Sequence, residues 1–155
     1  MQINTLLKDV FNEEQIVYLK TLYSSDSKIN LCEERGRADI YLGPEVREDI
    51  KDIIESYFDD SFYLYHITFS EYSLKHGIPN LPPHQDPKDH ITALTFDYQI
   101  ESNINWPICA DGICHDLQDN QAMVFDPKNM IHFRPELEFK EDDYVRILFF
   151  YVRQN

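Results

Sequence analysis

Two histidines and one aspartate have the residue types and spacing needed to bind a metal ion. His84 and Asp86 lie two positions apart in NLPPHQDPKDH, and His132 follows in MVFDPKNMIHFRP. Residues i and i+2 of an extended segment face the same way, so His84 and Asp86 can converge on one point. Prolines on both sides restrict the backbone there. The pattern indicates a pair of ligands that is set before the ion binds.

With His132 as third ligand, two imidazoles and one carboxylate would lie on one side of an ion. This set leaves other coordination positions open and is typical of non-haem Fe(II) oxygenases. A structural zinc site would close its shell with four protein ligands, usually including cysteine. The alternative without a metal is a polar loop in which Asp86 hydrogen-bonds the His84 ring, with His132 as a buried structural histidine.

Two arginines near the C-terminus have the chemistry to bind an anion. Arg146 shares one face of the expected strand YVRILFFYV with apolar residues, so it needs a carboxylate from the protein or from a ligand. Arg134 lies two residues after His132, and both would point into one cavity if that segment is extended. For Arg134, a substrate carboxylate and a salt bridge at the cavity rim are both compatible with the sequence. For Arg146 the alternative is an internal ion pair.

In its order and spacing, this set resembles the Fe(II)- and 2-oxoglutarate-dependent dioxygenases of the prolyl-hydroxylase-like, double-stranded β-helix type. The similar segments are NEEQIVYLKTLY, EYSLKHGIPNLPPHQD, DNQAMVFDPKNMIH and the strand that carries Arg146, 14 positions after His132. The resemblance covers most of the chain. It implies that His84, Asp86 and His132 hold Fe(II), that Arg146 binds 2-oxoglutarate, and that O₂ is consumed. Tyr72 is the candidate for a further contact with the 2-oxoglutarate carboxylate, and a core tyrosine with a satisfied hydroxyl is the equal alternative.

The implied activity is hydroxylation of a small molecule, with an amino acid favoured, or of a residue in a peptide, with release of succinate and CO₂. Arg134 is the candidate contact for a substrate carboxylate. The chain departs from the family at Leu148, where relatives often carry serine, and in its few glycines between the ligands. One alternative is a cupin-like metal- or small-ligand-binding barrel without oxygenase activity, in which Arg146 has an internal partner. Another is an interaction module that kept the fold and lost turnover.

The net charge and the cysteine content indicate which class of partner and which cellular compartment to expect. The formal net charge of −14 repels nucleic acid and an anionic membrane surface, so we expect a small-molecule or peptide substrate. Without a signal-like N-terminus, a soluble, cytoplasmic protein with three free thiols is expected. The Asp111-Gly112 pair predicts a two-residue hairpin turn that sets Cys109 opposite Cys114, so a disulfide between them is an open alternative.

The periodicity predicts two helices followed by a strand-rich region within one domain of 155 residues. We expect helices at about 13–24 and 44–58, a loop at 24–28, a strand at 38–43, and mostly strands from residue 62. The helical part would cover about 1–60 and the core about 61–155. The expected fold class is mainly β: a double-stranded β-helix, or jelly roll, with N-terminal helices packed on one sheet.

Overall fold

The computed structural model describes residues 3–23 and 28–155, and most of its regular structure is antiparallel strand. Its elements in chain order are β1 (Leu6–Leu7), α1 (Glu13–Lys20), β2 (Asn30–Cys32), the 3₁₀ helix η1 (Glu33–Arg35), β3 (Arg37–Tyr41), α2 (Pro44–Glu55), β4 (Phe62–Ser73), the 3₁₀ helix η2 (Leu74–His76), β5 (Leu81–His84), β6 (Leu94–Ser102), β7 (Ile108–Ala110), β8 (Ile113–His115), β9 (Gln121–Phe125), β10 (His132–Arg134) and β11 (Tyr144–Gln154).

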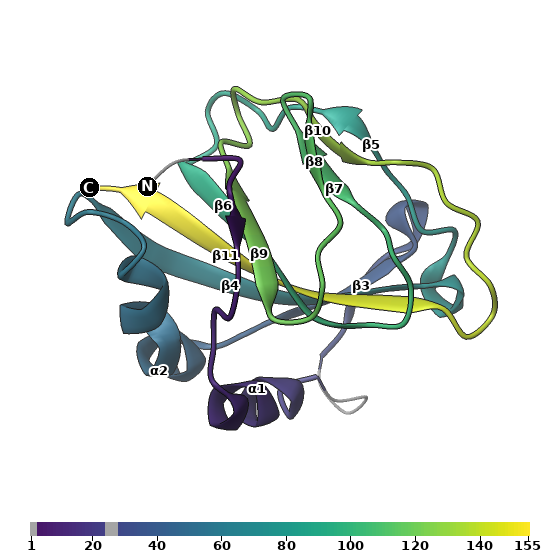
Figure 1. Ribbon diagram of the computed structural model, residues 1–155, viewed down its shortest axis with the longest axis horizontal. Helices are drawn as coiled ribbons and strands as arrows, with labels where there is room; N and C mark the ends of the chain where they lie inside the picture. The colour runs from purple at the N-terminus through teal and green to yellow at the C-terminus, as the bar shows by residue number, and fades with distance from the viewer. Residues whose placement is uncertain (1–2, 24–27) are drawn as a thin grey trace.

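These strands form two facing sheets (Figure 1). The larger has seven strands in the order β1-β9-β6-β11-β4-β3-β2, and the smaller has four in the order β5-β10-β7-β8. From β4 onward the chain passes between the sheets at each connection except the β7–β8 hairpin. This alternation defines a double-stranded β-helix, so the predicted fold class is confirmed.

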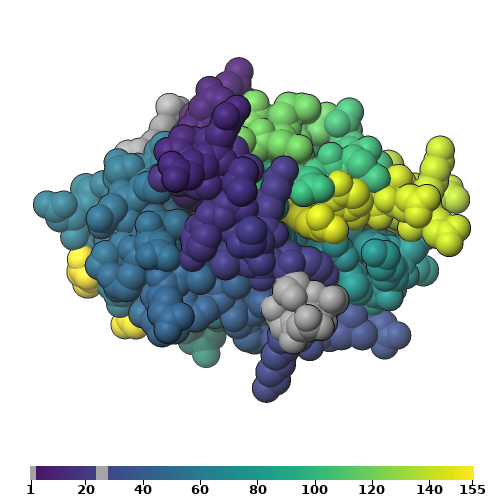
Figure 2. Space-filling view, turned by 90° about the horizontal axis from the view of Figure 1, so that it is seen from below, coloured from purple at the N-terminus to yellow at the C-terminus, as the bar shows by residue number. Residues whose placement is uncertain are grey.

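Both helices lie on the outer face of the seven-stranded sheet, away from the smaller sheet (Figure 1). The start of α1 is fixed by a capping box, in which Asn12 and Gln15 satisfy each other's backbone N–H groups. From α1, Leu19 packs into the apolar layer on this face, and α2 contributes Ile50 and Ile54. Figure 2 shows that residues from the N-terminal third cover most of this side of the molecule.

The C-terminal strand β11 separates the two faces of the large sheet. Leu148 and Phe150 belong to the apolar layer beneath the helices. Ile147 and Phe149 belong to a second cluster on the inner face, toward the smaller sheet. Because side chains alternate along a strand, residue 146 must lie on the helix side together with Leu148.

The long helices and strands lie where the sequence predicted them, but some of them end at other residues than predicted. The first helix stops at Lys20, capped by Thr21, and the second stops at Glu55. The short strands β1 and β2 were missed because two or three residues carry no readable periodicity. Most of the loop predicted at 24–28 lies outside the described residues. Of the helices that are described, none has the length and hydropathy to cross a membrane.

Candidate metal centre

The three predicted metal ligands lie together between the two sheets. His84 ends β5, His132 begins β10, and antiparallel pairing makes them direct cross-strand neighbours. Asp86 follows β5 by two residues and is held by its backbone N–H, which donates to the Pro127 carbonyl at 2.8 Å. The ligand atoms of the three side chains all lie within 4.8 Å of one another. Asp86 Oδ1 is 3.6 Å from His84 Nε2 and 3.4 Å from His132 Nε2.

Backbone carbonyls orient both imidazoles toward this point. His84 Nδ1 lies 2.7 Å from the Pro82 carbonyl, and His132 Nδ1 lies 3.0 Å from the Met130 carbonyl. A carbonyl can only accept, so each Nδ1 donates its hydrogen and each Nε2 keeps a free lone pair. Hydrogen bonding of the second ring nitrogen is the usual way in which proteins fix metal-binding histidines.

The local electrostatics favour the protonation states that a metal requires. Burial lowers the pKa of His84, which favours its neutral imidazole. Burial by itself would raise the pKa of Asp86, but positive charge beside it, supplied by His132 when that ring is protonated, brings it below its usual value. A neutral imidazole and an ionised carboxylate are the forms that bind metal.

The donor set fits a divalent ion with open coordination positions. In the part of the chain that the structure describes, no further His, Cys, Asp or Glu joins this group of three. A closed structural zinc site needs four protein ligands, whereas two imidazoles and one carboxylate on one side suit Fe(II). His84, Asp86 and His132 could therefore hold the ion while the adjoining cavity leaves room for other ligands.

This cavity has a volume of about 250 Å³ and extends from the three ligands to the inner face of the large sheet. Its wall combines charged, polar and apolar side chains. They are Arg35, Arg37, Tyr72, Leu81, His84, Asp86, Thr95, Asp97, Phe125, Pro127, His132, Phe149 and Tyr151.

Arg37 on β3 also lines this cavity, although it is not among the site residues predicted from the sequence. Its Nη1 donates a hydrogen bond to the Tyr72 hydroxyl at 3.1 Å, and its Nε lies 2.9 Å from Asp39 Oδ1. The available signal was the alternation in RADIY, which places residues 37 and 39 on one strand face. The strand expected at 38–43 began one residue too late to include the arginine.

A tight contact between two loops places Arg37 beside the metal centre. Gly36 has φ of +61°, and a Cβ built on it would lie 2.3 Å from the backbone nitrogen of Pro79. Glycine therefore lets β3 begin directly against the segment that leads into β5. Backbone hydrogen bonds from Asn80 to Arg35 and from Ser73 to Gly36 hold the same junction.

Tyr72 lines the cavity, but Arg146 does not. Arg146 lies on the helix side of the large sheet, where its Nε donates to Glu71 Oε2 at 2.8 Å and its Nη1 is 3.5 Å from Glu101 Oε1. This corrects the expected placement. The physical reason is the strand alternation, which puts residue 146 on the face opposite to Phe149.

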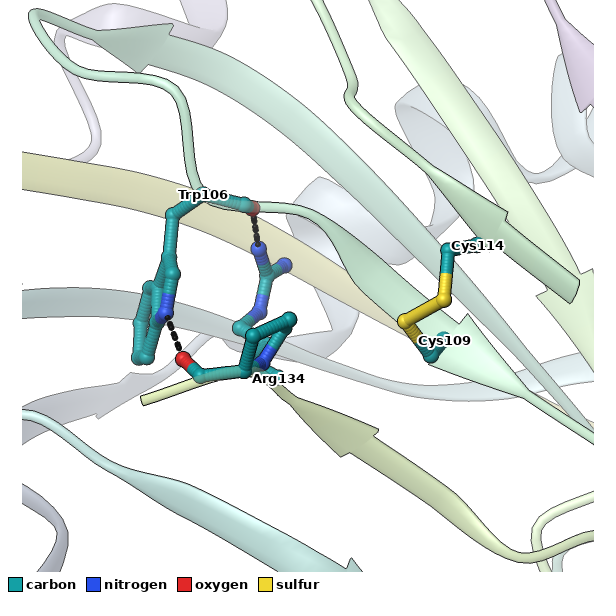
Figure 3. Close-up of a disulfide and its surroundings, with 5 residues drawn as sticks. Trp106, Cys109, Cys114 and Arg134 are labelled. Carbon is teal, nitrogen blue, oxygen red and sulfur yellow. Dashed lines mark hydrogen bonds between the residues drawn. A yellow bond between two sulfur atoms is a disulfide. The ribbon is translucent and has the colours of Figure 1, made fainter. Parts of the chain in front are cut away.

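Arg134 also pairs with a carboxylate of the protein, that of Asp97. Its side chain is fully buried, and Nη2 lies 3.1 Å from Asp97 Oδ1. Nη1 donates to the Trp106 carbonyl at 2.6 Å, as Figure 3 shows, and the guanidinium carbon lies 5.1 Å from the centre of the Trp106 ring. Of the two roles compatible with the sequence, the structure therefore favours a salt bridge, at a buried position rather than at the rim.

The β7–β8 hairpin carries a disulfide between Cys109 and Cys114 (Figure 3). The predicted turn at Asp111-Gly112 sets these residues opposite each other, which confirms the pairing considered from the sequence. The expectation of three free thiols is wrong for this pair, and Cys32 is free.

A second cavity, of about 340 Å³, adjoins the metal centre and shares Asp86 and Tyr151 with the first. Its other lining residues are mostly aromatic or hydroxyl-bearing: Tyr41, Tyr65, His66, Thr68 and His90. Asp86 and Tyr151 therefore border both cavities.

No family model matches the sequence, and no curated protein matches it. The fold, however, is similar to that of solved structures. An oxidoreductase of the 2OG-Fe(II) oxygenase family from Burkholderia pseudomallei matches with a TM-score of 0.73 at 7% identity, over 97% of this chain and 85% of that chain. A prolyl-4-hydroxylase from Pseudomonas putida matches with a TM-score of 0.70 at 12% identity, over 97% of this chain and 92% of that one.

A third similar structure is SnoN, a non-haem alpha-ketoglutarate-dependent epimerase from nogalamycin biosynthesis. It matches with a TM-score of 0.71 at 10% identity, over 96% of this chain and 75% of that chain. Identities this low show a shared fold and leave the reaction open. The resemblance stated from the sequence is thus confirmed for the fold.

Proposed function

We propose that this protein is an Fe(II)- and 2-oxoglutarate-dependent dioxygenase. The observation that carries the proposal is the convergence of His84, Asp86 and His132 at a cavity that is also lined by two arginine side chains. When bound, Fe(II) supplies the activation of O₂ that organic side chains cannot provide. The proposed reaction takes 2-oxoglutarate, O₂ and a substrate C–H bond to succinate, CO₂ and an alcohol. One oxygen atom enters the substrate and the other enters succinate.

The protein's own residues contribute position and exclusion of water. The carbonyl-bound imidazoles of His84 and His132 are preset for coordination, so little reorganisation is needed when the ion arrives. Phe125 and Phe149 line the cavity and keep part of its wall dry. The adjoining aromatic cavity, which includes Tyr41, offers room for the substrate beside Asp86.

We further propose that the substrate is a small molecule or a peptidyl residue and not a nucleic acid. The net charge of −14 opposes polyanions and anionic membrane surfaces. An amino acid was favoured partly because Arg134 could bind its carboxylate, and the buried pair with Asp97 removes that argument. The cytoplasmic assignment remains a prediction, and one of its bases is lost because Cys109 and Cys114 form a disulfide.

A second candidate function, a metal-binding barrel without oxygenase activity, is favoured by one observation. This alternative requires an internal partner for Arg146, and Glu71 is such a partner. The oxygenase proposal stands because Arg37 brings a guanidinium into the cavity from another strand. The two functions differ in whether the metal-loaded protein binds 2-oxoglutarate.

The test is an anaerobic titration of the Fe(II)-loaded protein with 2-oxoglutarate, followed through the weak visible charge-transfer band of the chelate. We expect a saturable band in the wild type and none in His132→Ala. In air, succinate should form only with iron present. Iron binding without any band at millimolar 2-oxoglutarate would reject the oxygenase and support the binding barrel.

A further inference from the structure

We propose that Arg37 on β3, together with the Tyr72 hydroxyl, binds the distal carboxylate of the 2-oxo acid in the role that the sequence assigned to Arg146. This inference rests on the proposed function and names the residues that would hold its cosubstrate. The cation would then come from a strand near the start of the fold instead of the last strand of the jelly roll.

Arg37 and Tyr72 lie in the cavity where the cosubstrate would bind. Arg37 and Tyr72 both line the cavity that contains the three metal ligands, whereas Arg146 lies on the opposite face of the same sheet. Arg37 and Tyr72 are direct cross-strand partners of β3 and β4. Their guanidinium and hydroxyl groups are therefore carried on the inner face of a rigid sheet, and an anion between them and the metal would meet both.

Arg37 has hydrogen-bond donors that the protein does not use. A guanidinium has five N–H donors. Within the described residues Arg37 donates from Nη1 to Tyr72 and pairs through Nε with Asp39, while no hydrogen bond of its Nη2 group is found. The nearby Asp39 Oδ1 already accepts a hydrogen bond from the Ser70 hydroxyl at 2.5 Å. A carboxylate binds two adjacent guanidinium N–H groups well, so a ligand carboxylate can use donors that the protein leaves unpaired.

The Arg37 guanidinium is held in place before any ligand binds. Its central carbon lies 5.6 Å from the centre of the Tyr72 ring and 5.9 Å from that of Phe149. Aromatic rings at this distance attract the cation and restrict its rotamers. The ion pair with Asp39 fixes the Nε edge. Less side-chain entropy is then lost when an anion is bound.

Arg146 differs from Arg37 in the face of the sheet on which it lies and in the number of carboxylates around it. Its Nε is paired with Glu71, whose side chain is 4% exposed, and the rings of Tyr23 and Tyr144 lie 5.4 Å and 4.6 Å from its guanidinium carbon. Glu101 completes the group at 3.5 Å. Two carboxylates of the protein thus already neutralise this arginine, and it has no access to the metal cavity.

The test compares two ligands and two matched variants. 2-Oxoglutarate and 2-oxobutyrate share the metal-chelating end, but only 2-oxoglutarate has the distal carboxylate. Their dissociation constants are measured anaerobically on the Fe(II)-loaded protein from the charge-transfer band and by calorimetry. Arg37→Met and Arg146→Met each leave a largely buried carboxylate of the large sheet without its arginine partner. The loss of stability that is unrelated to ligand binding should therefore be similar in the two variants.

We expect the wild type to bind 2-oxoglutarate about 10- to 150-fold more tightly than 2-oxobutyrate, the range for one charge-assisted contact. In Arg37→Met this ratio should fall to about 1, whereas in Arg146→Met it should stay within about threefold of the wild type. Tyr72→Phe, which keeps the ring and removes the hydroxyl, should lower the ratio by about threefold to tenfold.

Arg37→Lys keeps the charge and provides a second variant if Arg37→Met does not fold; its ratio should lie between those of the wild type and Arg37→Met, because a lysine cannot form the paired contact. An unchanged ratio in the folded Arg37 variants, or a collapsed ratio in Arg146→Met, would overturn the assignment of Arg37. If the iron-loaded wild type binds neither 2-oxo acid, the proposed function itself fails.

Discussion

Replacing Arg134 by methionine should destabilise the fold strongly, although the sequence made this residue a substrate contact. The Arg134 and Asp97 side chains are 0% and 1% exposed, and their charged atoms approach to 3.1 Å. Removing one partner of a buried pair typically costs about 3–5 kcal/mol, because the other charge stays buried without compensation. The lost hydrogen bond to the Trp106 carbonyl acts in the same direction.

For a domain of this size, about 3–5 kcal/mol corresponds to a fall of about 6–20 °C in Tm. The assay is urea and thermal unfolding followed by the fluorescence of Trp106, the single tryptophan of the chain. Arg153→Met removes an exposed arginine and is the control, with an expected change within about 0.5 kcal/mol. The double variant Arg134→Met/Asp97→Asn should recover at least about half of the loss, because it also removes the unpaired carboxylate.

The defect should also depend on pH. Burial raises the pKa of Asp97, and Arg134 acts in the opposite direction. Without the arginine, the pKa of this carboxyl in the folded state rises further above that of the unfolded chain. A raised folded-state pKa means that stability is lost as pH increases. Arg134→Met should therefore be less stable at pH 8 than at pH 5 relative to the wild type.

One result would refute this reasoning. If Arg134→Met unfolds within about 1 kcal/mol of the wild type and instead loses only substrate-dependent succinate release, then Arg134 is a substrate contact and the buried pair contributes little. Loss of stability with recovery in the double variant would establish the structural role.

Three further predictions concern the metal, the hairpin and the outer face of the sheet. His132→Ala should weaken Fe(II) binding at least ~100-fold by calorimetry, since even changes behind a ligand cost about 10- to 100-fold; near-normal affinity would exclude the proposed site. Unreduced, denatured protein should show a single free thiol, and replacing Cys109 and Cys114 by serine should cost about 2 kcal/mol of unfolding free energy for so short a loop. Three free thiols would contradict the disulfide. Burial raises the pKa of Glu71, but the hydrogen bond from Arg146 helps to bring it below its usual value. Stability from this carboxylate is present above its unfolded pKa and lost as pH falls, so the difference between wild type and Glu71→Gln should shrink between about pH 5 and pH 2; a constant difference would contradict it.

The long elements and the pairing of His84 with Asp86 as candidate ligands could be predicted because their signals are local. Asn12 and Gln15 form a capping box within four residues, and the Asp111-Gly112 pair by itself favours the two-residue hairpin turn between β7 and β8. His84 and Asp86 lie on one extended segment, so their convergence follows from backbone geometry. Short-range physics of this kind can be read from one sequence.

The partners of the arginines were decided by the tertiary structure alone. Alternation along β11 shows that Arg146 shares a face with Leu148 and Phe150, but it does not say which face meets the metal. That choice depends on which sheet surface the helices cover, and α1 and α2 cover the Arg146 side.

The sequence by itself determined a strand-rich chain and the convergence of His84 with Asp86, because these follow from periodicity and from a spacing of two residues. His132 lies far downstream, so its place beside them depends on the pairing of β5 with β10. Only the folded chain decided that Arg37, far upstream, lines the cavity and that Arg134 is paired with Asp97. Contacts between strands distant in sequence depend on sheet order and register. A side chain's partner at such a position is fixed when the sheets pack, and no local pattern encodes it.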